Sequence, residues 1–110
     1  MSEISVITNN DEKTQHAIEA LKFVMDPEIG LNVADLGLIY QIDFDENEKK
    51  VYCTHTLTTQ FCPMGDAIQS GVINALEQTF RGYEVVAKVV FEPHWSAELI
   101  SDDGRDFLNM

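Results

Sequence analysis

Cys62 is the residue of this chain whose position best suits chemistry. A run of apolar and β-branched residues, 51–59, precedes it, and Pro63 follows it before apolar residues recur at helical spacing. Proline is favoured in the first turn of a helix, because its missing N–H would have no partner there. The pattern therefore predicts Cys62 at a helix N-terminus, where backbone N–H groups and the helix dipole favour a thiolate. A thiolate attacks electrophiles and binds soft metals, whereas the alternative is a small buried apolar residue.

Two threonines and an acidic loop could support this thiol. The hydroxyls of Thr58 and Thr59 could bond the thiolate or hold the turn, although both residues also suit the end of a strand. Asp26, Glu28 and Asp35 lie in a segment rich in turn residues and could orient a metal or a histidine. Loop carboxylates more often face solvent or cap the backbone.

Three further residues have a functional and a structural interpretation. His55 lies near the end of the strand that leads to Cys62, which makes it a candidate co-ligand, but its alternation places it on the core face. Trp95 follows a proline turn and is either a core-capping aromatic or an anchor for a protein partner. Cys53 lies in mid-strand among apolar neighbours and is predicted to be core.

The elements that position these residues follow from hydrophobic periodicity and turn signals. A helix is predicted from a cap at Asn9 or Asn10 to Pro27, and a second from Met64 to Phe80 with Gly82 as its C-terminal cap. Strands are predicted at 38–44, 51–57 and 85–91, with a short last helix from Ser101 to near Leu108. The first two strands form an antiparallel hairpin, and residues 1–9 are expected to be a loose start. The order is α-β-β-α-β plus a tail, which predicts an α+β fold in two layers with a small mixed sheet.

Composition limits the class of protein. The chain has 110 residues, of which 45% are hydrophobic, so we expect one domain over 1–110 with a core of about 12–108. Its formal charge of −12 argues against nucleic-acid binding and against anionic membranes, and it suits solubility, a basic protein partner or attraction of a cation. The N-terminus lacks the basic and apolar runs of a signal peptide, so a cytoplasmic protein with two reduced cysteines is expected.

Three sets of motifs, taken in order, resemble the PaaD/SufT family of small iron–sulfur assembly factors. The first is Asp26-Pro27-Glu28 with Asp35-Leu36-Gly37-Leu38, the second is Leu57-Thr58-Thr59 with Cys62-Pro63, and the third is Glu92-Pro93-His94-Trp95 with Ile100-Ser101 and Gly104-Arg105. The chain departs from the family pattern at Gln60-Phe61, at Ser96-Ala97 and at His55, where an aliphatic residue is common.

The resemblance implies a domain of the iron–sulfur cluster assembly type and a role in maturing iron–sulfur proteins. It implies that Cys62 is the reactive cysteine, supported by Asp26, Glu28, Asp35, Thr58 and Thr59, with Trp95 in the family's P-x-W turn. The partners would be the assembly machinery and client proteins. The cargo would be iron or a transient iron–sulfur cluster, and no tightly bound cofactor is expected.

Three functions remain open from the sequence. The first is a non-catalytic factor for cluster assembly or delivery that acts through Cys62. One thiolate per chain cannot fill a cluster's four positions, so a homodimer, a partner or a small thiol would have to supply other ligands. The second is a cysteine-dependent enzyme that uses Cys62 with His55. The third is an interaction scaffold that carries no cargo.

Overall fold

The structure is a computed structural model that describes residues 6–27, 29–58, 65–92 and 94–108. Its sheet has the strand order β1-β2-β3-β4, with β1 parallel to β2, β2 antiparallel to β3, and β3 parallel to β4. The predicted α+β class with a small mixed sheet is confirmed. The strands are β1 (Ile7–Thr8), β2 (Ile39–Asp45), β3 (Lys50–His55) and β4 (Glu84–Val89). The helices are α1 (Asp11–Leu21), α2 (Gly65–Thr79), the 3₁₀ turn η1 (Ala97–Leu99) and α3 (Asp102–Leu108).

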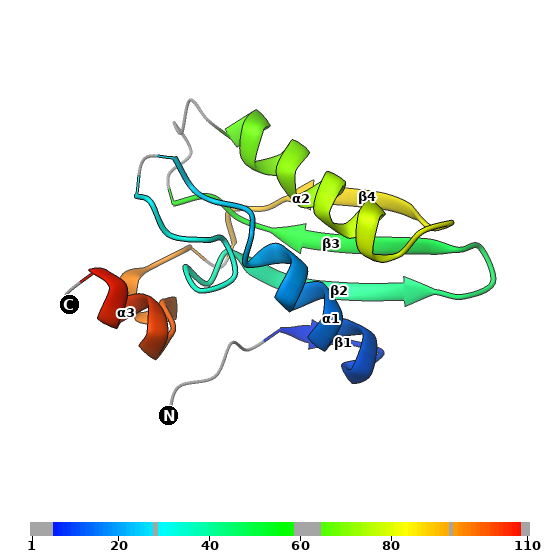
Figure 1. The fold of residues 1–110 in the computed structure, drawn as a ribbon, viewed down its shortest axis with the longest axis horizontal. Helices are drawn as coiled ribbons and strands as arrows, with labels where there is room; N and C mark the ends of the chain where they lie inside the picture. The colour runs from blue at the N-terminus through cyan, green and yellow to red at the C-terminus, as the bar shows by residue number, and fades with distance from the viewer. Residues whose placement is uncertain (1–5, 28, 59–64, 93, 109–110) are drawn as a thin grey trace.

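Helices α1 and α2 cover one face of the sheet (Figure 1). The strand residues beneath them, including Ile42, Val51 and Cys53, are buried. Residues of the opposite alternation point away from the helices, and Tyr52 and Val86 are accordingly 39% and 37% exposed. The molecule therefore has the two layers that the sequence predicts, with the core between the helices and one side of the sheet.

Helix α1 begins as expected, because the side chain of Asn10 accepts a hydrogen bond from Lys13 N at 3.0 Å. The predicted end near Pro27 is wrong, since the helix stops at Leu21. The chain leaves the helix to form a small antiparallel bridge between Met25 and Asn32. Backbone pairing within the loop after α1 thus replaces the last helical turns.

The first residues are not a loose start throughout. Ile7 and Thr8 pair in parallel with Gln41 and Ile42 of β2. A strand of two residues is too short to show any alternation in the sequence.

The predicted antiparallel hairpin is confirmed, with an irregularity near the site. Ile39 pairs with His55 and Gln41 with Thr54, so Tyr40 is an extra residue in β2. The bulge buries Ile39, which is 2% exposed, and leaves Tyr40 half-buried. It also fixes His55 opposite a core residue.

The apolar stripe of α2 packs as predicted over the described residues. Ile68, Val72 and Leu76 are buried, and the ring of Phe80 meets that of Phe44 edge-on at 5.1 Å. The backbone then reverses at Gly82, whose φ of +89° suits a residue without a Cβ.

The C-terminal segment forms the predicted short helix. Ser101 precedes α3, and its Oγ accepts a hydrogen bond from Gly104 N at 3.0 Å. Helix α3 lies at the end of the sheet away from the β2–β3 turn, beside the loop that follows α1 (Figure 1). No helix in the described ranges is long and apolar enough to cross a membrane.

Candidate functional site

The chain that leaves β3 and the start of α2 lie against each other on either side of the predicted thiol site. A Cβ added to Gly65, the first residue of α2, would lie 2.9 Å from Leu57 Cδ1. Glycine therefore permits the close approach of the helix start to the chain that leaves β3. Cys62 and Thr59 fall in 59–64, outside the described residues, so the predicted N-cap position of the thiol stays a prediction. Thr58, the last described residue before this segment, is half-buried.

His55 ends β3 and is fully buried, as its alternation predicts. Its Nδ1 lies 3.4 Å from the carbonyl oxygen of Thr56, and its Nε2 has no hydrogen-bond partner among the described residues. Burial lowers the pKa of His55, and the contact with the Thr56 carbonyl opposes that effect. The ring is therefore neutral near pH 7.

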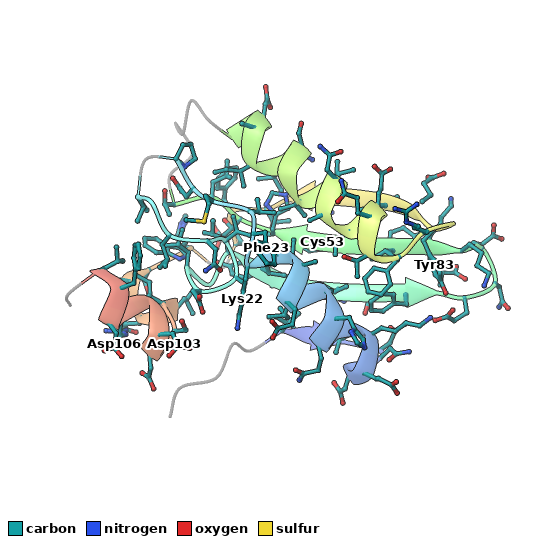
Figure 2. All side chains as sticks on the ribbon, viewed as in Figure 1. Lys22, Phe23, Cys53, Tyr83, Asp103 and Asp106 are labelled. Carbon is teal, nitrogen blue, oxygen red and sulfur yellow. The ribbon has the colours of Figure 1, made fainter. Side chains whose placement is uncertain are left out.

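Cys53 is core, as the sequence predicts. It lies on β3 beneath the two helices (Figure 2) and is 1% exposed. Burial raises the pKa of its thiol to about 12. Cys53 is thus a protonated, sequestered thiol that cannot act as a nucleophile near neutral pH.

Asp26 lies in the predicted acidic loop and is 1% exposed. Its Oδ1 accepts a hydrogen bond from Ile29 N at 3.2 Å, and its backbone oxygen accepts one from Gly30 N at 2.8 Å. Its backbone N–H donates to the Leu31 oxygen at 2.9 Å. These contacts hold the turn and agree with the backbone-capping alternative. Glu28, which lies between Asp26 and Ile29 in the sequence, is outside the described residues.

Asp35 joins the same loop to the C-terminal segment. Its Oδ1 accepts a hydrogen bond from Ser101 Oγ at 2.7 Å, and its Oδ2 accepts one from Asn32 Nδ2 at 2.7 Å. Its backbone oxygen also accepts a bond from Ser101 N at 2.8 Å. Both carboxylate oxygens therefore have protein donors, an arrangement that fixes the loop against α3.

Trp95 reinforces this junction from the other side of η1. Its indole Nε1 donates a hydrogen bond to the Leu36 oxygen at 2.6 Å, and its ring packs half-buried against the core. The next residue of the loop, Gly37, has a φ of +80°. A Cβ there would lie 2.4 Å from the Leu99 backbone oxygen, so only glycine fits where the loop passes η1.

The described site residues thus lie in separate places. Asp26 holds the turn of its own loop, and Asp35 and Trp95 fasten that loop to the C-terminal segment. His55 ends β3, and Thr58 lies in the chain that leaves it. Sequence reasoning missed Asn32 and Ser101 as partners of Asp35; Ser101 showed only its signal as a helix cap. No group of three or more His, Cys, Asp or Glu side chains in the described part of the chain could hold a metal ion.

The sequence matches a known family over most of its length. Residues 14–89, which include the acidic loop, β3 and α2, match the profile described as "Iron-sulfur cluster assembly protein". The chain belongs to the iron-sulfur cluster assembly protein family. The resemblance found in the motifs is therefore confirmed at the level of the family.

Two relatives of this family have names that state a function. The Fe-S protein maturation auxiliary factor YitW of Bacillus subtilis is 32% identical over 87 residues, which cover 79% of this chain and 84% of the relative. The Fe-S protein maturation auxiliary factor SufT of Staphylococcus aureus is 32% identical over 80 residues, covering 71% of this chain and 88% of the relative.

A solved structure of a family member has the same fold. A domain of unknown function from Bacillus anthracis superposes with a TM-score of 0.81 and 32% sequence identity. The match covers 87% of this chain and 91% of that one. The fold expected for the iron–sulfur assembly type is therefore present.

Proposed function

We propose that this protein is a non-catalytic accessory factor that helps to assemble iron–sulfur clusters or to deliver them to client proteins. The observation that carries the proposal is the match to relatives named Fe-S protein maturation auxiliary factors. These matches cover 71–79% of this chain and 84–88% of the relatives. Similarity that spans nearly the whole relative supports a shared role better than similarity to one motif would. The partners would be the assembly machinery and client proteins.

Cys62 is the thiol that we assign to the cargo. The chain has two cysteines, and Cys53 is disfavoured as a ligand because it is 1% exposed in the core, where burial also raises the pKa of its thiol to about 12. Iron–sulfur clusters are held by cysteine thiolates. Cys62 therefore carries the proposed chemistry, and Thr58 belongs to the proposed support around it.

An enzyme that pairs Cys62 with His55 is disfavoured by the burial of the histidine. The His55 ring is 0% exposed, so it reaches neither solvent nor a bound substrate unless the core opens. A general base must come within hydrogen-bond reach of the proton that it removes. Transient cargo handling needs no such base.

The number of thiolates limits how the cargo would be held. With Cys62 as the one thiolate ligand from each chain, three of four cluster positions are left to other ligands, and a homodimer would still leave two. A site with so few protein ligands releases its cargo readily. We therefore propose iron or a cluster as a transient substrate, with its other ligands supplied by a partner or a small thiol.

Anaerobic reconstitution with iron and sulfide tests the role of the thiol. The parent protein and Cys53→Ala should each form a substoichiometric chromophore that chelators remove, and Cys62→Ser should form none. Serine is chosen because it can also cap a helix N-terminus, so the fold is preserved. Circular dichroism and unfolding curves check that the variants fold.

The same variants are then compared in cells that lack their own factor, with the activity of an iron–sulfur client enzyme as the readout. Cys53→Ala should restore the client and Cys62→Ser should not. A stable full cluster in the monomer would contradict the proposed transient binding. Full restoration by Cys62→Ser would assign the protein to the scaffold class.

A further inference from the structure

Strand β4 forms one edge of the sheet, and its outer side pairs with no other strand among the described residues. On its inner side the register with β3 is continuous, and the Glu84 N–H donates to the Lys49 oxygen at 2.8 Å. Backbone groups of successive residues point to opposite sides of a strand, so those of Val85 and Ala87 point away from β3. The edge therefore presents backbone donors and acceptors that a further strand could pair with.

A contact from α2 confirms the direction of these groups. The Gln69 Nε2 donates a hydrogen bond to the Ala87 backbone oxygen at 3.1 Å. A carbonyl oxygen has two lone pairs, so it can accept a second bond from a paired strand. Ile73, one turn after Gln69 on the same side of α2, is half-buried. Both side chains are uncharged, so the part of α2 beside Ala87 brings no like charge to the edge.

The side chains of β4 that face away from the helices form a charge pattern. Glu84, Val86 and Lys88 are exposed, and the acid and the base lie two residues to either side of the valine. A half turn about an axis through Val86 therefore exchanges the position of Glu84 with that of Lys88. The strand is thus complementary in charge to a second copy of itself that runs antiparallel.

The same axis would join apolar side chains into one row on the open face of the sheet. Tyr52 of β3 is the neighbour of Val86 in the register of the two strands. Their side chains are 39% and 37% exposed. A second β4 strand would place its own Val86 beside this pair and extend the row, which removes apolar surface from water.

The charges select one register of such a pairing. With Val86 opposite its own copy, Glu84 lies directly opposite Lys88 of the second copy, and this pair occurs twice. In the same register Val85 lies opposite Ala87 of the second copy, and their outward backbone groups exchange two N–H···O bonds. A register centred on Ala87 would place Lys88 opposite Val86 and remove both ion pairs, and pairs of opposite charge across strands are favourable.

We propose that β4 pairs with β4 of a second copy of this chain in antiparallel orientation, which joins two sheets into one across a two-fold axis at Val86. Such an interface uses the same surface of both copies. The formal charge of −12 on each copy opposes association at long range. Salt screens that repulsion beyond about 8 Å at physiological ionic strength, whereas the charges of Glu84 and Lys88 meet in contact.

This pairing is independent of the cargo proposed at Cys62. Strands β3 and β4 are parallel, and the chain that leaves β3 leads to Cys62. In an antiparallel pair the carboxyl ends of these strands point in opposite directions in the two copies. The dimer would therefore not bring two Cys62 thiols to one cluster, and the two proposals can fail separately.

Sedimentation velocity of the full chain tests the association. At about 150 mM salt, with a reductant, the protein should change from monomer to dimer as its concentration rises. Amide hydrogen exchange tests the strand itself. The amides of Val85 and Ala87 should exchange more slowly as the concentration rises, whereas that of Glu84, bonded to Lys49 in each chain, should not depend on concentration.

Exchange of the two charges tests the register. Glu84→Lys and Lys88→Glu each place like charges opposite each other, so each should weaken the dimer about tenfold or more. They change the net charge in opposite directions, so a loss in both cannot come from the net charge. The double variant Glu84→Lys/Lys88→Glu should return to within about threefold of the parent affinity. A mixture of the two single variants should form the mixed dimer in preference to either homodimer.

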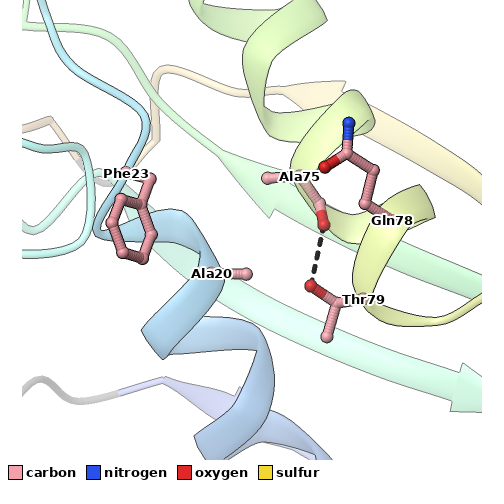
Figure 3. A pocket seen from close by; sticks show the side chains of 5 residues that line it. All are labelled: Ala20, Phe23, Ala75, Gln78 and Thr79. Carbon is pink, nitrogen blue, oxygen red and sulfur yellow. Dashed lines mark hydrogen bonds between the residues drawn. The ribbon is translucent and has the colours of Figure 1, made fainter.

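Phe23→Ala is the control on another surface. Phe23 is 87% exposed and lines an open hollow between α1 and α2 with residues that include Ala20 and Ala75 (Figure 3). This substitution should leave the dimer unchanged. Glu84 and Lys88 are exposed, so their variants should keep the circular dichroism of the parent, and they should form the same chromophore on reconstitution with iron and sulfide.

Several results would overturn the proposal. A chain that stays monomeric up to about 1 mM has no such interface. A dimer that both single charge variants leave intact uses another surface, and one that Phe23→Ala dissociates uses the hollow between the helices. If the parent is monomeric but an extended peptide with a glutamate and a lysine at the same spacing protects the amides of Val85 and Ala87, the edge binds a foreign strand instead.

Discussion

The side chains of Asp35 and Ser101, 66 residues apart in the chain, are joined by a hydrogen bond of 2.7 Å from Ser101 Oγ to Asp35 Oδ1. Ser101 Oγ also accepts the Gly104 N–H that caps α3. One hydroxyl therefore links the loop after α1 to the start of the last helix. Asp35, which the sequence placed in an acidic loop, has a structural partner at each carboxylate oxygen.

Asp35→Ala is expected to destabilise the protein. The substitution leaves the hydroxyl of Ser101 and the amide of Asn32 without their acceptor in a site where Asp35 is 9% exposed. Loss of a buried partner of this kind costs about 1–3 kcal/mol. Urea unfolding measures the change, and Asp106→Asn, on the exposed side of α3, is the control. Equal stability of the two variants would show that the junction contributes nothing.

Gly37→Ala is expected to be far more damaging than Gly30→Ala. Both glycines have a positive φ, +80° and +81°, so both substitutions carry similar backbone strain. The added methyl group at Gly37 would lie 2.4 Å from the Leu99 backbone oxygen, whereas at Gly30 it would meet nothing within 4 Å. The difference between their midpoints of thermal unfolding measures the cost of the clash with Leu99, apart from the backbone strain. Similar midpoints would contradict the close packing of Gly37 against Leu99.

Leu76→Ala and Phe80→Ala are expected to be structural lesions. Leu76 is fully buried in α2, and Phe80 packs on Phe44. Each substitution should lower the free energy of unfolding by roughly 2–5 kcal/mol, the usual range for removing a large core side chain. Phe23→Ala is the matched control for Phe80→Ala, because it removes the same ring from an exposed position. A near-neutral Phe80→Ala would mean that its half-buried ring adds little to the core.

Alkylation should distinguish the two cysteines. In the native protein, iodoacetamide should modify Cys62 first, with an apparent pKa below the ordinary value of about 8.5. Cys53 should stay unmodified up to high pH, because its thiol has a pKa raised to about 12. Both should react in urea, which is the control for reagent access. Faster native labelling of Cys53 would contradict the assignment of the thiol.

His55 should make the protein less stable in mild acid. Burial lowers its pKa in the folded state, so below the ordinary value of about 6.5 the unfolded chain binds a proton that the folded chain does not. The free energy of unfolding should therefore fall as the pH drops below about 6.5, by at most about 1.4 kcal/mol per pH unit for one group.

His55→Leu, which has no titrating group, should flatten that part of the curve. His16→Gln, at an exposed position, is the control for the substitution of a histidine. An unaltered slope in His55→Leu would show that the histidine accepts a proton in the folded state through an opening of the core.

The sequence by itself determined the elements whose signals are local. The caps at Asn10 and Ser101, the apolar spacing of α2 and the reversal at Gly82 each depend on neighbours within a turn or two, so each could be predicted. The core positions of Cys53 and His55 followed from strand alternation. The three sets of motifs, taken together, were sufficient to indicate the family.

Only the tertiary structure decided the features that depend on distant partners. Strand β1 exists because Ile7 meets Gln41, and α1 ends at Leu21 because the chain beyond it pairs with residues after the turn. The bonds from Ser101 to Asp35 and from Trp95 to Leu36 join segments that no local pattern relates. Such contacts depend on closing long loops, and their energy is set by the packing of the whole domain, so it cannot be read from periodicity.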